Sequence, residues 1–448
     1  MRFYNNYIKP LYFSRRFYWS LAVVIALFLV SYAWPFLFRI GQLAFLFVAV
    51  VMLLDYVNLF FNRKGVTAVR ELTERFSNGD ENKVQLVLKN HYHFRVHLKV
   101  IDEIPIQFQR RDFELSTSLA GEEQQRLVYQ LRPVERGEYI FHDTNLFIKS
   151  PLNVVVRRIK IEQEQMIKVF PSYLALRQFE LMAHSNNLAE AGSRKLRKIG
   201  HSLEFEQIKE YVTGDDIRSI NWKATARKGG QLMVNNFMDE RSQQVYCVID
   251  KGRVMKMPFE GMTLLDYAIN ATLILSRVAL IRQDKAGLLT FAEQIGHFLP
   301  ADRKAAQMGN ILEALYNQQT KFLETDFEKL YALIRSRVTQ RSLIVLFTNF
   351  ESLAGLQRQL PYIRSIARSH LVLVVFFENT ELRQLTEARA NDIESVYVKT
   401  IAEKFIHEKK LMVKELQQHG ILTILTAPEN LTVNTINKYL ELKAKQAI

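Results

Sequence analysis

One stretch decides the fold of the C-terminal half of this chain: Val245-Tyr246-Cys247-Val248-Ile249-Asp250. It is short, apolar and rich in β-branched residues, which is typical of a strand buried on both faces of a parallel sheet. Similar apolar runs follow it, and helical patterns lie between them. This alternation predicts a doubly wound α/β sheet that extends from residue 243 to residue 448.

The expected elements of this sheet can be given by residue range. Strands are predicted at 245–249, 287–291, 343–347, 372–377 and 421–425, with 295–299 returning as an antiparallel partner of the second strand. Helices are predicted at 264–282, 302–318, 327–337, 353–367, 401–419 and 430–445. Cys247 is the single cysteine, which excludes an internal disulfide and fits a reducing compartment. Inside a buried strand, its thiol is expected to be unreactive.

Just upstream lies the run Tyr211-Val212-Thr213-Gly214-Asp215-Asp216-Ile217-Arg218-Ser219-Ile220-Asn221-Trp222-Lys223-Ala224-Thr225-Ala226-Arg227. Gly-Asp-Asp is typical of a turn followed by a helix N-cap. Acids, arginines, an amide and an indole within one segment favour a hydrogen-bonded clasp, with Trp222 buried beneath paired charges. An alternative is that Asp215 and Asp216 form a carboxylate pair for metal-assisted hydrolysis. The residues of the predicted clasp are Gly214, Asp215, Asp216, Arg218, Asn221, Trp222, Thr225 and Arg227.

The pattern Gly-Asp-Asp-x-Arg-x-Ile-x-Trp-x-x-Thr-Ala-Arg at 214–227, placed before an α/β sheet, resembles the signature of domain of unknown function family fifty-eight. The resemblance implies a von Willebrand factor A-like domain without established enzymatic activity. It also implies association with MoxR-type AAA+ ATPases, and a role as an adaptor in assembling or maturing other proteins. Other von Willebrand A-type membrane proteins are further possible partners.

In von Willebrand A domains a divalent metal lies at the C-terminal edge of the sheet, on an Asp-x-Ser-x-Ser loop, a distant Thr and a further Asp. Here Asp250 matches the first acid, but Gly252 and Val254 replace both serines. Thr325 aligns with the Thr, and Asn349 takes the place of the second Asp. Two hydroxyl ligands and one negative charge are missing, so we expect no metal and no other cofactor.

Two apolar runs near the N-terminus, 17–38 and 40–54, predict a transmembrane hairpin with a turn around Arg39. A cleaved signal peptide is the weaker alternative, because the first run is too long. Asp55 follows the second run and is expected to reach water or Arg63. Basic residues flank both outer ends: Lys9, Arg15, Arg16, Arg63, Lys64, Arg70 and Arg75. These flanks predict a multi-pass protein of the bacterial cytoplasmic membrane, with its soluble domains facing the cytoplasm.

Residues 63–171 are predicted to form a β-sandwich, with strands at 84–88, 94–100, 126–131 and 139–141. His91, His93 and His97 are placed on one strand face as exposed polar positions rather than metal ligands. A helix is expected at 171–192, followed by a basic run at 193–198. The predicted division is a transmembrane hairpin at 1–62, a β-sandwich at 63–171, the signature segment at 172–242 and the α/β domain at 243–448.

Composition and motifs narrow the function. The chain of 448 residues carries a formal net charge of +14, which suits nucleic acid, anionic lipid or an acidic protein. It lacks a Gly-rich phosphate loop ending in Lys-Ser/Thr, a His-Glu-x-x-His pair and a Gly-x-Ser-x-Gly elbow. Part of the basic excess flanks the predicted spans. Taken with the resemblance, which implies an adaptor, the sequence favours a non-enzymatic, membrane-anchored scaffold that does not bind nucleic acid. A metal-dependent hydrolase and a nucleic-acid binder are the alternatives.

Overall fold

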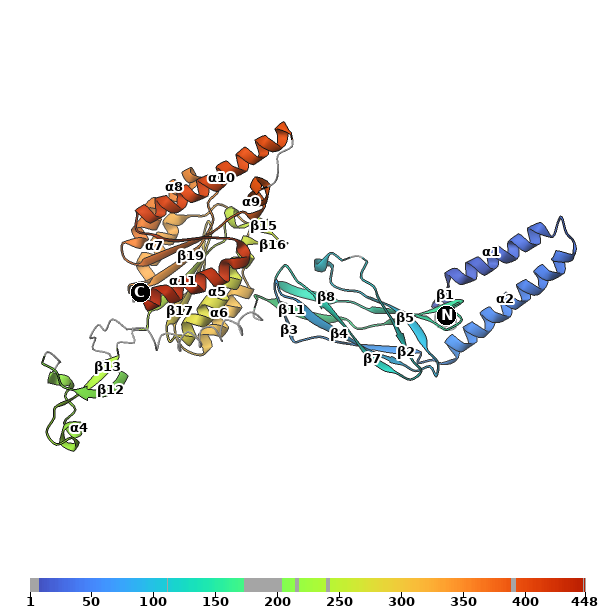
Figure 1. Cartoon of the computed structure of the whole chain (residues 1–448), viewed down its shortest axis with the longest axis horizontal. Coiled ribbons are helices and arrows are strands. Elements are labelled where there is room, and N and C mark those ends of the chain that lie inside the picture. The colour runs from blue at the N-terminus through green and yellow to red at the C-terminus, as the bar shows by residue number, and fades with distance from the viewer. Residues whose placement is uncertain are drawn as a thin grey trace. The chain divides into compact units, whose positions relative to one another are not determined.

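The structure is a computed structural model that describes residues 8–110, 112–172, 204–213, 217–238, 242–387, 392–445 and 447. Two compact units divide the chain, Met1–Phe170 and Pro171–Ile448 (Figure 1). The first is helical and β-rich, and the second contains an α/β domain, as the sequence predicted in outline. The helix expected at 171–192 and the basic run at 193–198 lie outside the described residues, apart from positions 171 and 172.

The first unit contains an antiparallel helical hairpin, α1 (Arg15–Val30) and α2 (Phe36–Phe61) (Figure 1). The predicted turn around Arg39 is wrong, because Arg39 lies within α2. The chain turns at 31–35 instead, where Ser31 ends α1 and Pro35 immediately precedes α2. Proline has no amide hydrogen to donate, so the start of a helix is the position that tolerates it.

Among the described residues, two helices are long and apolar enough to cross a membrane, α2 and α5 (Leu264–Ile281). The apolar part of α5 is 78% buried, so α5 is a core helix of the α/β domain. That leaves α2 as the candidate span, since only 6% of its apolar part is buried. The first predicted span corresponds to α1, whose 16 residues extend about 24 Å, short of a hydrocarbon core of about 30 Å.

The strands of the first unit form three sheets that enclose one apolar core. The five-stranded sheet has the order β1-β10-β9-β5-β6, and the two three-stranded sheets have the orders β2-β4-β7 and β3-β11-β8. The strands are β1 (Leu11–Phe13), β2 (Val66–Glu71), β3 (Arg75–Ser77), β4 (Asn82–Asn90), β5 (Val96–Asp102), β6 (Leu115–Leu119), β7 (Gln124–Leu131), β8 (Gly137–Phe141), β9 (Thr144–Lys149), β10 (Val155–Ile161) and β11 (Gln165–Phe170). A short 3₁₀ helix, Ile106–Phe108, follows β5. His91 and His93 lie in the loop between β4 and β5, so the prediction that they share a strand face with His97 is wrong.

The C-terminal end of α2 is built into this β core. Asp55 is fully buried and accepts hydrogen bonds from the amides of Val154 (2.9 Å) and Val155 (2.8 Å) and from the hydroxyl of Ser150. The expectation that Asp55 reaches water or Arg63 is therefore wrong. The sequence did not predict β1 either, which pairs with β10. Contacts thus cross residue 62, where the sequence analysis placed a boundary.

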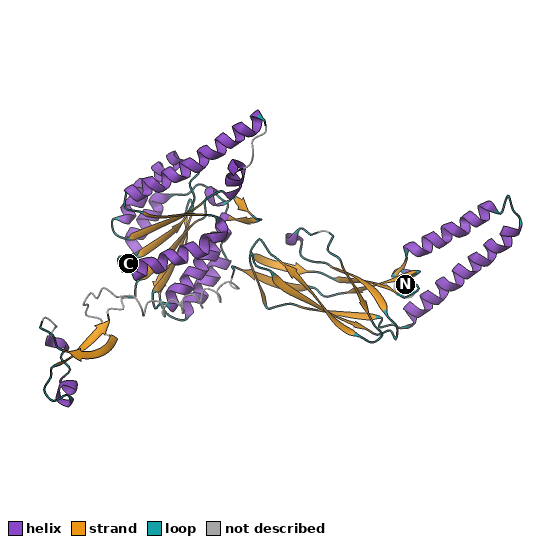
Figure 2. Cartoon of the chain, viewed as in Figure 1, coloured by secondary structure: helices purple, strands orange, loops and turns teal. Residues whose placement is uncertain are grey.

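The α/β domain is a six-stranded sheet with the order β18-β17-β14-β19-β20-β21. Only β18 is antiparallel to its neighbour, as predicted. Figure 2 shows helices on both faces of this sheet. One core cluster joins the sheet to α5, α6 and α11, and another joins it to α7, α8 and α10. The strands are β14 (Gln244–Asp250), β17 (Lys285–Phe291), β18 (Ile295–Asp302), β19 (Leu343–Phe347), β20 (Leu371–Phe377) and β21 (Leu422–Thr426), and the helices besides α5 are α6 (Ala306–Tyr316), α7 (Phe327–Arg337), α8 (Leu353–Ala367), α9 (Thr380–Glu387), α10 (Ile393–Gln418) and α11 (Leu431–Ala444).

Small elements complete the second unit. The signature segment forms a two-stranded antiparallel ribbon, β12 (Glu204–Glu210) and β13 (Met233–Met238). Between these strands lie a 3₁₀ turn, Ile217–Ser219, and the short helix α4 (Trp222–Arg227). In the α/β domain, a second small ribbon consists of β15 (Pro258–Phe259) and β16 (Met262–Thr263), and two 3₁₀ turns lie at Arg253–Met255 and Pro428–Asn430.

Candidate functional site

The carboxyl edge of the sheet centres on Asp250, the last residue of β14, whose side chain is fully buried. Its Oδ1 accepts hydrogen bonds from the hydroxyl of Thr325 (2.7 Å) and the amide of Gly252 (2.7 Å). Its Oδ2 accepts one from the hydroxyl of Thr348 (2.6 Å). Burial raises the pKa of this carboxyl, while these three donors act in the opposite direction. Both carboxyl oxygens are therefore occupied by donors from the protein itself.

Gly252 leaves no room for a side chain. A Cβ atom built there would lie 1.9 Å from Thr325 Oγ1 and 3.0 Å from Asp250 Oδ1. Glycine at this position thus allows the Thr325 hydroxyl to approach the acid directly. Val254, at the other serine position of the resemblance, lies in the 3₁₀ turn and packs against the apolar core.

Asn349 is engaged by a lysine that the sequence analysis missed. The Lys409 ammonium on α10 donates to Asn349 Oδ1 (2.7 Å) and to the carbonyl of Phe350 (2.5 Å). Burial lowers the pKa of Lys409 to about 8, and the charge of Glu351 opposes that shift only in part. One signal was available: Ala402, Lys409 and Leu416 are spaced for the buried face of a helix, where a lysine needs a polar partner.

The divalent metal implied by the resemblance does not fit these residues. Oxygen ligands around a hard cation must point lone pairs at it. Both oxygens of Asp250 accept hydrogen bonds from the protein, and the Asn349 oxygen faces an ammonium group. Lys251 adds a second, half-buried ammonium at this edge, and burial lowers its pKa as well. Hydrogen bonds within the protein and two ammonium groups thus occupy the edge at which the resemblance implies a cation.

In the signature segment, two of the predicted residues, Asn221 and Thr225, form a hydrogen-bond network. The Asn221 side chain caps α4 by accepting from the Ala224 amide (3.0 Å) and donates to Asn235 on β13 (2.8 Å). The Thr225 hydroxyl donates to the Asn221 carbonyl (2.9 Å) and accepts from the Met233 amide (3.0 Å). These bonds fix α4 against β13, so both residues have a structural role.

The Trp222 side chain is not part of that hydrogen-bond network. Its side chain is 69% exposed, so the expectation that it is buried beneath paired charges is wrong. Within the described part of this segment, a six-residue helix lies on a two-stranded ribbon, and these elements leave the indole uncovered. Arg218 and Arg227 are exposed as well. Gly214, Asp215 and Asp216 lie outside the described residues, so the acid–arginine clasp and the hydrolytic carboxylate pair stay predictions.

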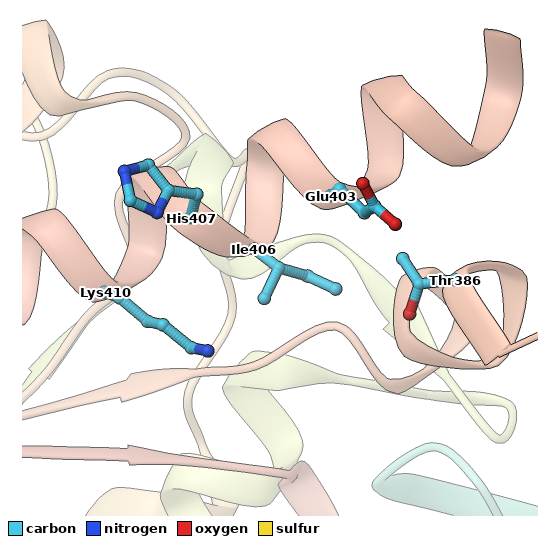
Figure 3. Close-up of a pocket in the computed structure, with 5 residues that line it drawn as sticks. All are labelled: Thr386, Glu403, Ile406, His407 and Lys410. Atoms are coloured by element: carbon cyan, nitrogen blue, oxygen red, sulfur yellow. The ribbon is translucent and has the colours of Figure 1, made fainter.

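A hollow of about 450 Å³ lies between α9 and α10. In Figure 3 Thr386 comes from α9, and the other four side chains come from α10. An acid, an imidazole and an ammonium share this lining with one aliphatic side chain, and they do not form a set of metal ligands. The lining residues are Thr386, Glu403, Ile406, His407 and Lys410.

Comparison with known proteins places this geometry in a family context. Residues 207–407 match the family model "Protein of unknown function DUF58". The uncharacterized protein YeaD of Bacillus subtilis is 23% identical over 243 residues, which cover 52% of this chain and 60% of YeaD. The match thus spans less than two thirds of that relative. The family model covers less than half of the chain, so the match shows that residues 207–407 are similar to a family of unknown function.

Solved structures resemble parts of the chain at low scores. The conserved hypothetical protein BatB of Bacteroides thetaiotaomicron is 15% identical and has a TM-score of 0.32, with coverage of 45% of this chain and 99% of BatB. The CARDB domain of the PF1109 protein of Pyrococcus furiosus is 13% identical and has a TM-score of 0.17, with coverage of 23% of this chain and 86% of that domain.

Proposed function

We propose that this protein is a non-enzymatic, membrane-anchored scaffold or adaptor whose α/β domain is a degenerate von Willebrand factor A-like domain. The strand order β18-β17-β14-β19-β20-β21, with β18 antiparallel, supports that class of domain. The apolar helix α2 supports attachment to a membrane. Since a scaffold acts by binding, its surfaces rather than a reactive group carry the function.

The observation that carries the proposal is the state of Asp250. Three of the roughly four lone-pair positions of its carboxyl group are used by Thr325, Thr348 and the Gly252 amide, which leaves little capacity for a metal or substrate. A purified chain is therefore expected to give no saturable calorimetric signal with micromolar Mg²⁺ or Mn²⁺. Saturable binding that Asp250→Ala abolishes would contradict the proposal and favour metal-assisted chemistry.

A MoxR-type AAA+ ATPase is the proposed partner, on the strength of the signature resemblance, and other von Willebrand A-type membrane proteins are further candidates. The test is binding of the detergent-solubilised full chain to a purified MoxR-type ATPase from the same organism, measured by interferometry. We expect saturable binding that a denatured chain does not show. No binding in any nucleotide state of the ATPase would refute this partner.

We propose that the hairpin spans the bacterial cytoplasmic membrane, with α2 as one span and α1, extended by the apolar turn at 31–35, as the other, and that the soluble domains face the cytoplasm. Basic residues on the outer flanks of the hairpin, Arg15, Arg16, Arg63 and Lys64, support this orientation. Protease added to intact spheroplasts should leave the chain after Arg63 uncut, whereas lysed spheroplasts should lose it. Cleavage in intact spheroplasts would refute the orientation.

A further inference from the structure

The signature segment presents apolar side chains that its own elements cannot cover. Val212, Ile217 and Trp222 are 63%, 70% and 69% exposed. A two-stranded ribbon is marginally stable in water unless it packs against another layer. These residues lie within eleven positions of one another, in the loop after β12, in the 3₁₀ turn and in α4. Large exposed apolar side chains are typical of an interaction surface, and Trp is enriched where such surfaces bind most strongly.

This surface is also basic. The 3₁₀ turn Ile217–Ser219 and helix α4 together contain three basic side chains and no acidic one. Lys223 and Arg227 lie on α4 with Trp222 and are exposed. We call Ile217, Trp222, Lys223 and Arg227 the Trp222 face.

A second uncovered apolar surface lies at the N-terminal end of α10. Ile393 is 91% exposed and Tyr397 is 68% exposed, and Val396 is exposed beside them. These positions recur at helical spacing, and α9 packs alongside with Leu385 exposed. In Figure 1 this end of α10 projects beyond the sheet. We call Ile393, Val396, Tyr397 and Leu385 the α10 tip.

The α10 tip is acidic where the Trp222 face is basic. Residues 378–398 contain five acidic and two basic side chains. Four of the acids are exposed, and Asp392 caps α10, which lowers the pKa of its carboxyl and keeps it ionised. The exposed acids are Glu381, Glu387, Asp392 and Glu394. Two apolar surfaces of opposite charge on one chain are complementary in both respects that stabilise an interface.

We propose that the Trp222 face of one copy docks on the α10 tip of a second copy. The short link between β13 and β14 favours docking between two copies over docking within one chain. From Met238 to Gln244 the backbone reaches at most about 22 Å, and the six residues of β13 add about 20 Å. Gln244 lies at the amino edge of the sheet, where α10 ends before β21. The tip lies at the other end of the 26 residues of α10, about 39 Å away, so docking within one chain requires nearly full extension.

The docking goes beyond the adaptor proposal and does not rest on it. It is a heterologous contact, in which each copy offers one surface and receives the other. Two copies form a closed dimer if each docks its Trp222 face on the α10 tip of the other. Otherwise successive copies form an open chain along the membrane. The self-association itself is what the experiment measures.

The test is disulfide cross-linking between full-length chains in native membranes. Cys247, the single natural cysteine, is buried in β14, so engineered thiols react without interference. One chain carries Ala226→Cys on α4 and another, with a different tag, carries Val398→Cys on α10. Under mild oxidation we expect a mixed dimer only when both are present, and neither chain alone should cross-link. Absence of the mixed dimer would overturn the proposal.

Charge reversal identifies the cause of the contact. Lys223→Glu with Arg227→Glu on the Ala226→Cys chain should lower the cross-linked fraction by about tenfold. Glu387→Lys with Glu394→Lys on the other chain should restore it, which also shows that the reversed chains fold. Lys83→Glu with Lys89→Glu on β4 is the matched control and should leave the mixed dimer unchanged. No loss on reversal, no restoration, or a cross-link that forms only within one chain carrying both cysteines would overturn the proposal.

Discussion

Replacing Gly252 by alanine tests how the acid at the sheet edge is held. Gly252 has φ −78° and ψ −179°, a conformation that any residue adopts, so the backbone itself imposes no penalty. The added Cβ would lie 1.9 Å from Thr325 Oγ1, and one of the two groups has to move. Gly309→Ala on α6 is the matched control, because a Cβ there meets nothing within 4 Å. That control should be stabilising by about 0.5–1 kcal/mol, as alanine is in a helix interior.

The magnitude follows from the contacts that Gly252→Ala disrupts. Moving the Thr325 hydroxyl removes a hydrogen bond to a buried carboxyl group, which costs about 1.5–3 kcal/mol. Fitting an extra carbon into a packed site adds about 1–3 kcal/mol. We therefore expect a loss of about 3–5 kcal/mol in the free energy of unfolding of the α/β domain. With Thr325→Ala already present, the obstructing atom is gone, and the further loss should be about 1 kcal/mol.

Cys247 provides the assay. The thiol is fully buried in β14, and burial raises its pKa to about 12, so it reacts with a thiol reagent only when the α/β domain opens. Labelling of the detergent-solubilised full chain across a denaturant series gives the unfolding midpoint of this domain alone. If Gly252→Ala costs the same with and without Thr325→Ala, within about 0.5 kcal/mol, the steric reasoning is refuted.

Three further predictions concern other buried charges. Asp55→Ala should increase amide hydrogen exchange across residues 150–156, measured by mass spectrometry, because backbone donors there lose their acceptor; unchanged exchange would contradict the anchoring role. Arg70→Met should cost about 3–5 kcal/mol by leaving the buried carboxylate of Asp102 without its cation. Arg70→Met with Asp102→Leu should recover part of this loss, because the hydroxyls of Tyr129 and Thr144 then lose their acceptor; a double variant as unstable as the single one would contradict this. Since the folded pKa of Lys409 is about 8, below its ordinary 10.5, the unfolded chain binds more protons between these values. Stability should therefore rise with pH across that window in the wild type relative to Lys409→Met, and parallel profiles would contradict it.

The α/β domain was predictable because its elements carry local signals. Predicted helices 327–337 and 353–367 coincide with α7 and α8, and the predicted strand at 343–347 coincides with β19. Each is a periodic or continuous apolar run with clear ends. The N-terminal boundary of α10 was missed by eight residues, because its first turns are exposed at Ile393 and Tyr397 and lack the apolar–polar contrast that marks a helix face.

The sequence predicted where the site lies, but not which side chains bind its residues. Asp250, Thr325 and Asn349 were singled out by their places in the resemblance, and the structure brings Asp250 and Thr325 into contact. Thr348 and Lys409 were not predicted, because each acts through a partner distant in sequence: Thr348 lies 98 residues from Asp250, and Lys409 lies 60 residues from Asn349. The exposure of Trp222 was missed for the opposite reason, since an indole is usually placed in a core.

The joint between α2 and the β core shows how an acid at the end of an apolar helix can be misread. An acid at the end of an apolar helix is expected to be hydrated at the membrane surface. Asp55 instead accepts hydrogen bonds from two backbone amides at the start of β10. One turn later, the guanidinium of Arg157 in β10 donates to the carbonyls of Leu59 (2.6 Å) and Asn62 (2.7 Å) at the end of α2. The last carbonyl groups of a helix have no amide donor within the helix, and the guanidinium supplies that donor. The helix dipole also favours a positive charge at this end. Because charged side chains join α2 and β10 by hydrogen bonds at both positions, the C-terminal end of α2 is fixed to the β core by both elements.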